Sequence, residues 1–188
     1  LEAERILRHM TSLKEAQGLK DVGPDAFSYI MVMRAWANSK KSNRGQRVAW
    51  LLSKQWRDFE FLGEPSLRPT VEAYNTAIRV WIDLQEPHES EKILQELLHC
   101  AANDESGPLR PNSESFGLMI RAWLKVAANG NINGLETARG WLEDLEQREK
   151  LEIGVLASVE LYSMFLGAAR NCASLNPEKV LQMSSSVF

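Results

Sequence analysis

Apolar residues recur every three or four positions along most of this chain, in segments separated by short polar turns. That spacing places them on one face of an α-helix, and no segment shows the two-residue alternation of a half-buried strand. We therefore predict an all-α protein. The predicted helices cover residues 1–17, 26–38, 44–59, 71–83, 87–102, 113–127, 132–150 and 157–172, and another opens at Asn176-Pro177.

A set of landmarks recurs three times in the same register: a proline, an aromatic residue five positions later, an arginine ten positions later and a tryptophan twelve positions later. The prolines stand 45 and 42 residues apart, and periods in this range are typical of solenoids. The copies are Pro24, Tyr29, Arg34 and Trp36; Pro69, Tyr74, Arg79 and Trp81; Pro111, Phe116, Arg121 and Trp123; and, more faintly, Ala157, Tyr162, Gly167 and Ala169.

Each unit is predicted to be two helices, A and B, joined by a turn, with a return loop leading to the next proline. In the second unit helix A follows Pro69-Thr70, where the threonine can cap the first turn, and Pro87 opens helix B. We predict one right-handed α-solenoid of stacked helix-turn-helix repeats. Its parts are a half repeat at 1–23, repeats at about 24–68, 69–110 and 111–156, and a partial repeat at 157–188.

Helix A is predicted to have a packing face and a ligand face. Each tryptophan stands seven residues after the aromatic residue, about 20° away around the helix, so the two share the packing face. The ligand face carries the residue after each aromatic, the arginine four residues later, and the residue two before the aromatic. These are Ile30, Asn75, Gly117 and Ser163; Arg34, Arg79 and Arg121; and Phe27, Glu72, Glu114 and Glu160.

The arginine row allows two interpretations. Guanidinium groups suit phosphate oxygens and can stack on bases, which favours a single-stranded nucleic acid as the ligand. Alternatively, the arginines pair with glutamates of the same or adjacent A helices, which leaves a neutral ladder that only holds the repeats in register. The sequence leaves both interpretations open.

The second unit contains Val71-Glu-Ala-Tyr-Asn-Thr-Ala-Ile-Arg-Val-Trp, then Ser90-Glu-Lys-Ile-Leu-Gln-Glu-Leu, and a return loop ending in Arg110-Pro111-Asn112. These segments resemble a pentatricopeptide repeat, and the resemblance extends over nearly the whole chain. It implies a protein of mitochondria or chloroplasts that binds single-stranded RNA, one nucleotide per repeat, in organellar RNA processing, stability or translation.

In that family, the residue after the helix A aromatic and the last residue of the repeat together read a base. The resemblance therefore implies three pairs: Ile30 with Thr70, Asn75 with Asn112, and Gly117 with Ser158. Ser163 holds the first of these places in the partial repeat, and Lys125 stands where family repeats often hold a phosphate-binding lysine. The chain departs from the family in three respects. The residue that sandwiches the base is usually aliphatic, but here it is Glu72, Glu114 and Glu160; the units are 42 to 46 residues long, which is longer than usual; and the lysine site is basic only at Lys125.

Composition and charge narrow the classes of function. The 188 residues are 44% hydrophobic and 25% charged, with a formal net charge of -3. No apolar run approaches the roughly 18 residues of a membrane span, so we expect no membrane insertion. The two separated cysteines indicate a reduced compartment. No nucleotide-binding loop, zinc motif or catalytic constellation is found, so we expect no enzyme activity, cofactor or small-molecule substrate.

Two functions follow from these patterns. The resemblance and the arginine row favour the first, which is binding of single-stranded RNA. The glutamate row and the acidic net charge favour the second, a protein-protein interaction scaffold or a subunit of an organellar assembly such as a mitochondrial ribosome, which holds its partner on the concave surface. Because the chain opens at Leu1 within a helical pattern, we expect it to be an internal fragment without its targeting segment.

Overall fold

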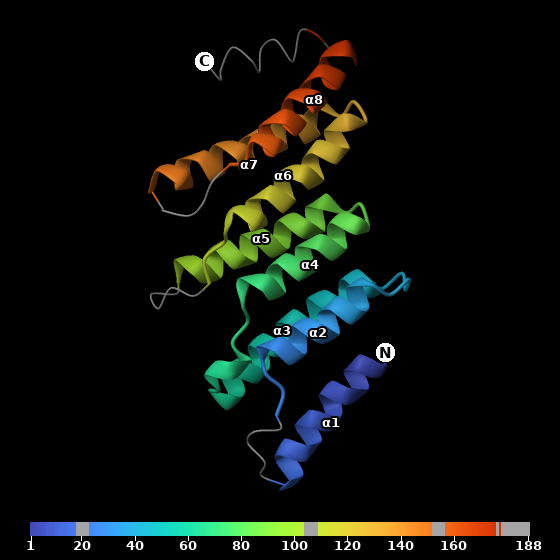
Figure 1. The fold of residues 1–188 in the computed structure, drawn as a ribbon, viewed down its shortest axis with the longest axis vertical. Helices are drawn as coiled ribbons and strands as arrows, with labels where there is room; N and C mark the ends of the chain where they lie inside the picture. Colours follow the sequence, from blue (N-terminus) through green and yellow to red (C-terminus); the bar gives the residue numbers. More distant parts are fainter. Residues whose placement is uncertain (18–22, 104–108, 152–156, 176, 178–188) are drawn as a thin grey trace. The chain divides into compact units, whose positions relative to one another are not determined.

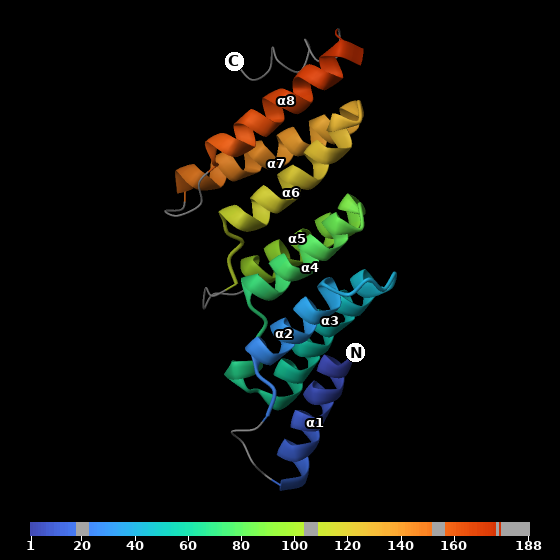
Figure 2. The same cartoon turned by 45° about the vertical axis from the view of Figure 1, so that its right-hand side comes forward.

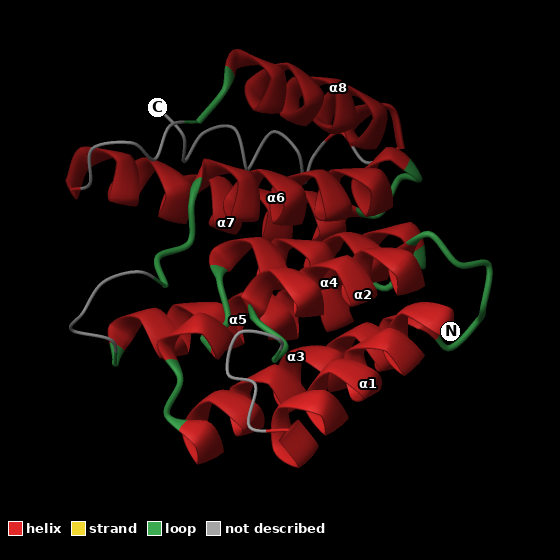
Figure 3. Cartoon of the chain, turned by 60° about the horizontal axis from the view of Figure 1, so that its bottom comes forward, coloured by secondary structure: helices red, strands yellow, loops and turns green. Residues whose placement is uncertain are grey.

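The computed structural model describes residues 1–17, 23–103, 109–151, 157–175 and 177. Within these residues the chain forms α-helices and one short 3-10 turn, η2, and contains no strand, which confirms the all-α prediction (Figure 3). The elements are α1 (Glu2–Gln17), α2 (Ala26–Ala37), α3 (Arg44–Leu62), η2 (Pro65–Leu67), α4 (Val71–Asp83), α5 (Pro87–Ala102), α6 (Ser113–Ala128), α7 (Ile132–Leu151) and α8 (Val159–Leu175).

The predicted helix boundaries agree closely with the structure. Helices α4 and α5 have the predicted ends, and α2, α6 and α7 differ from their predicted ranges by a single residue at the C-terminal end. Helix α3 continues past the predicted end to Leu62. Helix α8 covers Val159–Leu175 instead of the predicted 157–172, so it lies two to three residues further along the chain. The helix predicted to open at Asn176-Pro177 lies, apart from Pro177, outside the described residues.

The chain divides into two compact units, Leu1–Arg110 and Pro111–Phe188. In the first unit α2 pairs with α3 and α4 with α5, α4 also packs against α2 and α3, and α1 packs against α2 (Figures 1 and 2). In the second unit α6 packs against both α7 and α8. We call α2, α4, α6 and α8 the A helices, and α1, α3, α5 and α7 the B helices.

Each A helix begins directly after a residue whose side chain caps it. The side-chain oxygen accepts a hydrogen bond from the backbone N–H three residues later, an amide that has no acceptor within the helix. These bonds join Asp25 to Ser28 at 2.7 Å, Thr70 to Ala73 at 3.4 Å, Asn112 to Ser115 at 3.0 Å and Ser158 to Leu161 at 3.3 Å. In the first three cases the repeated proline precedes the cap, so this landmark marks the start of helix A.

The packing face of the A helices is buried, as predicted. The aromatic residues of the three clear copies are fully buried, and the tryptophans expose at most 8% of their surface. These residues are Tyr29, Tyr74, Phe116, Trp36, Trp81 and Trp123. In the fourth copy Tyr162 is exposed, in keeping with its weaker match to the repeat. The aromatic and tryptophan landmarks are therefore core residues.

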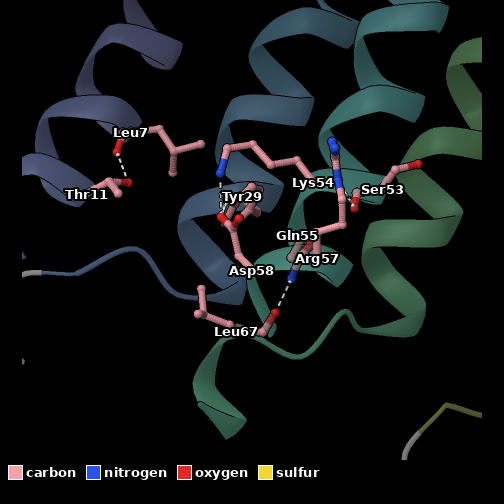
Figure 4. Close-up of polar contacts among 9 residues, drawn as sticks. All are labelled: Leu7, Thr11, Tyr29, Ser53, Lys54, Gln55, Arg57, Asp58 and Leu67. Carbon is pink, nitrogen blue, oxygen red and sulfur yellow. Dashed lines mark hydrogen bonds and ion pairs between the residues drawn. The ribbon is translucent and has the colours of Figure 1, made fainter. Parts of the chain in front are cut away.

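The segment between α3 and α4 explains the length of the first repeat. Helix α3 extends to Leu62, and Gly63 ends it in the left-handed conformation, with φ +63°, which glycine adopts without steric cost. The chain then returns through η2, where the Leu67 side chain is buried. The buried Gln55 side chain of α3 donates to the Leu67 carbonyl at 3.0 Å (Figure 4). The extra residues are thus packed against the repeat.

Candidate ligand-binding surface

Two arginines of the predicted ligand face pair with glutamates of the next A helix. In the first unit, Arg34 Nη2 of α2 binds the Glu72 carboxylate of α4. In the second unit, Arg121 Nη2 of α6 lies 3.5 Å from Glu160 Oε2 of α8. Both pairs join the arginine position of one A helix to the glutamate position of its successor. We call these four residues the paired row.

The paired row favours the neutral-ladder interpretation for these two arginines. Its side chains are between 41% and 68% exposed, so each pair contributes only about 0–1 kcal/mol to stability. The larger consequence is electrostatic, because each guanidinium is matched by one carboxylate. A phosphate group that approaches the row therefore meets little net positive potential.

The remaining basic candidates are exposed. Arg79 lies on α4 and Lys125 lies in the last turn of α6. A cation near the C-terminus of a helix interacts favourably with the helix dipole and its terminal carbonyl groups. Lys125 therefore has a local structural role in addition to the phosphate-binding role that the resemblance implies.

Three predicted base-reading residues lie inside the protein. Ile30 and Asn75 are each 3% exposed, and Gly117 is also buried. The expectation that these positions lie on an accessible face is wrong, because each A helix has neighbours on more than one side. Helix α2 packs against α1, α3 and α4, and a Cβ at Gly117 would lie 3.7 Å from the Leu161 side chain of α8. Of the four positions after the aromatic, Ser163 alone is exposed.

The second member of each predicted base-reading pair is an exposed helix cap. Thr70, Asn112 and Ser158 use a side-chain oxygen to accept the backbone hydrogen bond that starts α4, α6 and α8. Asn112 also takes part in a reciprocal capping box, because its backbone N–H donates to Ser115 Oγ at 3.2 Å. The capping role therefore explains why Thr, Asn and Ser stand at these positions.

In the three clear copies, the helix A aromatic also ties the A helix to helix B of the same repeat. The Tyr29 hydroxyl donates to the Asp58 carboxylate of α3, which also binds Lys54 Nζ at 2.5 Å (Figure 4). Burial, and then the hydrogen bond to Asp58, raise the pKa of Tyr29 above its ordinary value. In the second unit Phe116 packs against Trp141 of α7, with ring centroids 6.3 Å apart. The aromatic residue therefore contacts helix B both as a tyrosine, which has a hydroxyl group, and as a phenylalanine, which has none.

Tyr74 forms the centre of a second polar cluster in the first unit. Its hydroxyl accepts from Trp56 Nε1 at 2.7 Å, donates to Glu96 Oε1 at 3.3 Å and lies 3.6 Å from Cys100 Sγ. Burial raises the pKa of Tyr74, and the neighbouring Cys100 and Glu96 raise it further. Burial also raises the pKa of the Glu96 carboxyl. The cluster joins α3, α4 and α5, and each group in it has a partner, which is typical of a structural network.

Glu4 is not one of the repeat landmarks, but in the described part of the chain it is the charged residue among the buried polar side chains. Its carboxylate accepts from Trp36 Nε1 at 3.0 Å and from Arg47 Nη2 at 3.0 Å, which joins α1 to both α2 and α3. Burial alone would raise the pKa of Glu4, but the hydrogen bonds from Arg47 and Trp36 outweigh it and hold the pKa below its ordinary value of 4.5. A sequence signal exists, since Glu4 lies three residues before Leu7 on the apolar stripe of α1.

The described part of the chain contains neither a metal-binding cluster nor a membrane-spanning helix. There, no group of three or more His, Cys, Asp or Glu side chains is placed to hold a metal ion. Over the same residues, no helix combines the length and the apolar character needed to cross a bilayer.

Comparisons with known proteins give no family assignment. No protein-family model matches the chain, and a search of curated proteins finds no match. The resemblance to pentatricopeptide repeats therefore rests on the residues of the repeat, and it stays a prediction.

Proposed function

We propose that this chain is a protein-interaction module of the pentatricopeptide type, whose helix pairs stack as a right-handed α-solenoid. The paired row is the observation that carries the proposal. Arg34 and Arg121, which would be the phosphate contacts of an RNA-binding face, are each matched by a carboxylate of the neighbouring A helix. A face of alternating charge suits a protein partner, whose own surface offers both signs.

The positions expected to read bases support the same proposal. Ile30, Asn75 and Gly117 are buried, and their partners Thr70 and Asn112 cap helices. Sequence-specific recognition of a single strand requires side chains that reach the base edges. Since packing and capping account for these residue types, a base-reading role is not needed to explain the repeat.

Single-stranded RNA is the second candidate ligand. One observation favours it, namely the exposure of Lys125 at the position where the resembling family often holds a phosphate-binding lysine. With either ligand, the resemblance is the ground for proposing a mitochondrial or chloroplast protein. The protein-binding proposal also includes a role as a subunit of an organellar assembly such as a mitochondrial ribosome.

The two candidates can be separated with one set of variants. A displayed library of random peptides, panned on the wild-type chain, should enrich ligands that lose binding when Arg34, Arg79 and Arg121 are replaced by Glu. A fluorescence anisotropy titration with pooled single-stranded RNA should stay at background at physiological salt. RNA binding that weakens with salt and disappears in the Arg→Glu variant, together with no peptide enrichment, would overturn the proposal in favour of RNA.

A further inference from the structure

In the first and third repeats, helix B brings a cation to the aromatic residue of helix A. Lys54 Nζ of α3 lies 5.8 Å from the centre of the Tyr29 ring. Arg148 Cζ of α7 lies 5.3 Å from the centre of the Phe116 ring. A cation at such a distance is attracted by the negative face of the ring. The two repeats therefore share this contact although one aromatic is a tyrosine and the other a phenylalanine.

Each of these cations also pairs with a carboxylate one turn away on its own helix. Lys54 Nζ binds Asp58 Oδ2 at 2.5 Å (Figure 4). Arg148 Nε lies 3.2 Å from Asp144 Oδ2. An aromatic ring, a cation and a carboxylate thus recur together where helix B packs against helix A.

The second repeat has the aromatic residue and the carboxylate but not the cation. Tyr74 of α4 donates to Glu96 Oε1 of α5 at 3.3 Å. Lys92, one turn before Glu96, pairs instead with Glu89 at 2.5 Å. Burial raises the pKa of the Glu96 carboxyl, and no cation in the described part of the chain offsets this. The sequence that follows α5, residues 104–108, contains no Lys or Arg.

Glu96 borders an open groove of about 300 Å³ between α3 and α5, within the first unit. The groove is lined by an indole, two carboxylates, a hydroxyl and a thiol, which belong to Ser53, Trp56, Glu60, Glu96 and Cys100. The indole is held in place, because its Nε1–H donates to the Tyr74 hydroxyl at 2.7 Å. An aromatic wall with carboxylates beside it suits a guanidinium or ammonium group.

We propose that this groove binds an arginine side chain of the protein partner, which supplies to the second repeat the cation that Lys54 and Arg148 supply to the other two. The guanidinium stacks on the Trp56 indole and donates N–H groups to the Glu60 and Glu96 carboxylates. Arginine suits the groove better than lysine, because its planar group can stack and donate at the same time. The inference rests on the proposed function for the class of partner, and it adds the chemistry that this partner carries.

Nuclear magnetic resonance of the full chain tests the contact with a single guanidinium as the probe. The indole N–H signal of Trp56, identified by its loss in Trp56→Phe, should shift saturably as N-acetylarginine amide is added at constant ionic strength. The citrulline analogue, which is neutral and has nearly the same shape, should leave the signal in place. Glu96→Gln and Glu60→Gln should each weaken binding by about threefold to tenfold, because each removes a charge-assisted hydrogen bond from a partly exposed site.

Glu86→Gln is the matched control for the loss of charge. Glu86 precedes α5, is exposed and does not line the groove, so its replacement should leave the affinity for N-acetylarginine amide unchanged.

A cation supplied by the chain itself should close the site. In the third repeat the cation follows its carboxylate by four residues, as Arg148 follows Asp144. Cys100 follows Glu96 at the same spacing and lines the groove. Cys100→Arg should therefore abolish binding of N-acetylarginine amide, whereas Cys100→Ser, which adds no charge, should retain it. Circular dichroism of both variants should show the helix content of the wild type.

The other outcomes overturn the inference. A Trp56 signal that does not respond, or that responds equally to the citrulline analogue, would show that the groove does not recognise a guanidinium. Binding that survives Glu96→Gln, Glu60→Gln or Cys100→Arg would place the site elsewhere.

The outcome for the groove can be told apart from the outcome for the proposed function. If the displayed library yields peptides that depend on Arg34, Arg79 and Arg121 while N-acetylarginine amide does not bind, the groove inference is wrong and the proposed function stands. If N-acetylarginine amide binds in the groove while the library yields no peptide, the guanidinium site stands and the proposed function is wrong.

Discussion

On α2, α4 and α6 the tryptophan lies on a buried face and the arginine, two residues earlier in the sequence, lies on a face that solvent reaches. The buried face is the same in each copy, because an aromatic residue and a tryptophan fill the same place in the packing. The charged face differs between the A helices. On α2 Phe27 stands at the glutamate position, and on α8 Gly167 stands at the arginine position. A residue therefore recurs in this chain for one of two reasons. It packs in the core, or it pairs with a residue of the neighbouring A helix and so sets how the two helices align.

The largest effect is expected on the buried face. Replacement of Trp81 by Ala should lower the free energy of unfolding by about 3–5 kcal/mol, because Trp81 is buried against Gly45 of α3 and its loss leaves a cavity between α4 and α3. Urea denaturation followed by circular dichroism measures this. Arg79→Ala on the same helix is the control, and its effect should stay within about 0.5 kcal/mol. Equal losses in the two variants would remove the distinction between the faces.

A smaller effect is expected at the buried carboxylate that joins α1 to this face. Glu4→Gln removes the ion pair with Arg47 and should cost about 1–3 kcal/mol at neutral pH. Since the pKa of Glu4 is lowered below 4.5 in the folded state, its stabilisation is present above that pH and is lost as the pH falls through the folded pKa.

The wild-type advantage over Glu4→Gln should accordingly shrink when the urea titrations are repeated at successively lower pH. A difference in stability that stays constant, or that grows as the pH falls, would contradict the assignment of Glu4 as a charged, hydrogen-bonded carboxylate.

The helix cap at Asn112 separates the structural role of a landmark from a role in ligand binding. Asn112→Ala should cost about 1 kcal/mol, whereas Asn112→Asp, which keeps the capping oxygen, should retain most of the stability. Thermal unfolding of both variants measures this. If alanine proved harmless to stability but changed the affinity for RNA, the base-reading role would be favoured over the cap.

The smallest effect is expected on the charged face. A double-mutant cycle of Arg34→Ala and Glu72→Ala should give a coupling energy of about 0.2–1 kcal/mol, which falls as salt is added. The measurement is the free energy of unfolding of the four chains at two ionic strengths. A coupling energy of zero at low salt would mean that the two side chains do not form a pair in solution.

The elements of this fold could be predicted well from the sequence because their signals are local. Helix α4 has its predicted ends, since Thr70 caps it and the apolar spacing runs unbroken to Asp83. The spacing of Trp36, Trp81 and Trp123 from the aromatic residues predicts that they lie in the core, and the structure confirms it.

The accessible surface could not be predicted equally well, because burial depends on which helices become neighbours. Ile30 and Asn75 lie on the face assigned to the ligand but are covered in the structure. The partners of Glu4 and Tyr29 lie many residues away, so local spacing gives no sign of them. The pairing of Arg34 with Glu72 is one of the two interpretations that the sequence leaves open. The structure favours it because α4 lies beside α2.

The central claim is that glutamates of neighbouring A helices neutralise the arginines of the charged face. The most direct test is the affinity for single-stranded RNA of the wild-type chain and of the Glu72→Gln, Glu160→Gln chain, titrated over a range of salt. The claim predicts background binding by the wild type and measurable binding by the variant, with a salt slope of about -1.4 for two released arginines. Wild-type binding that is already salt-dependent, and that the two substitutions leave unchanged, would contradict it.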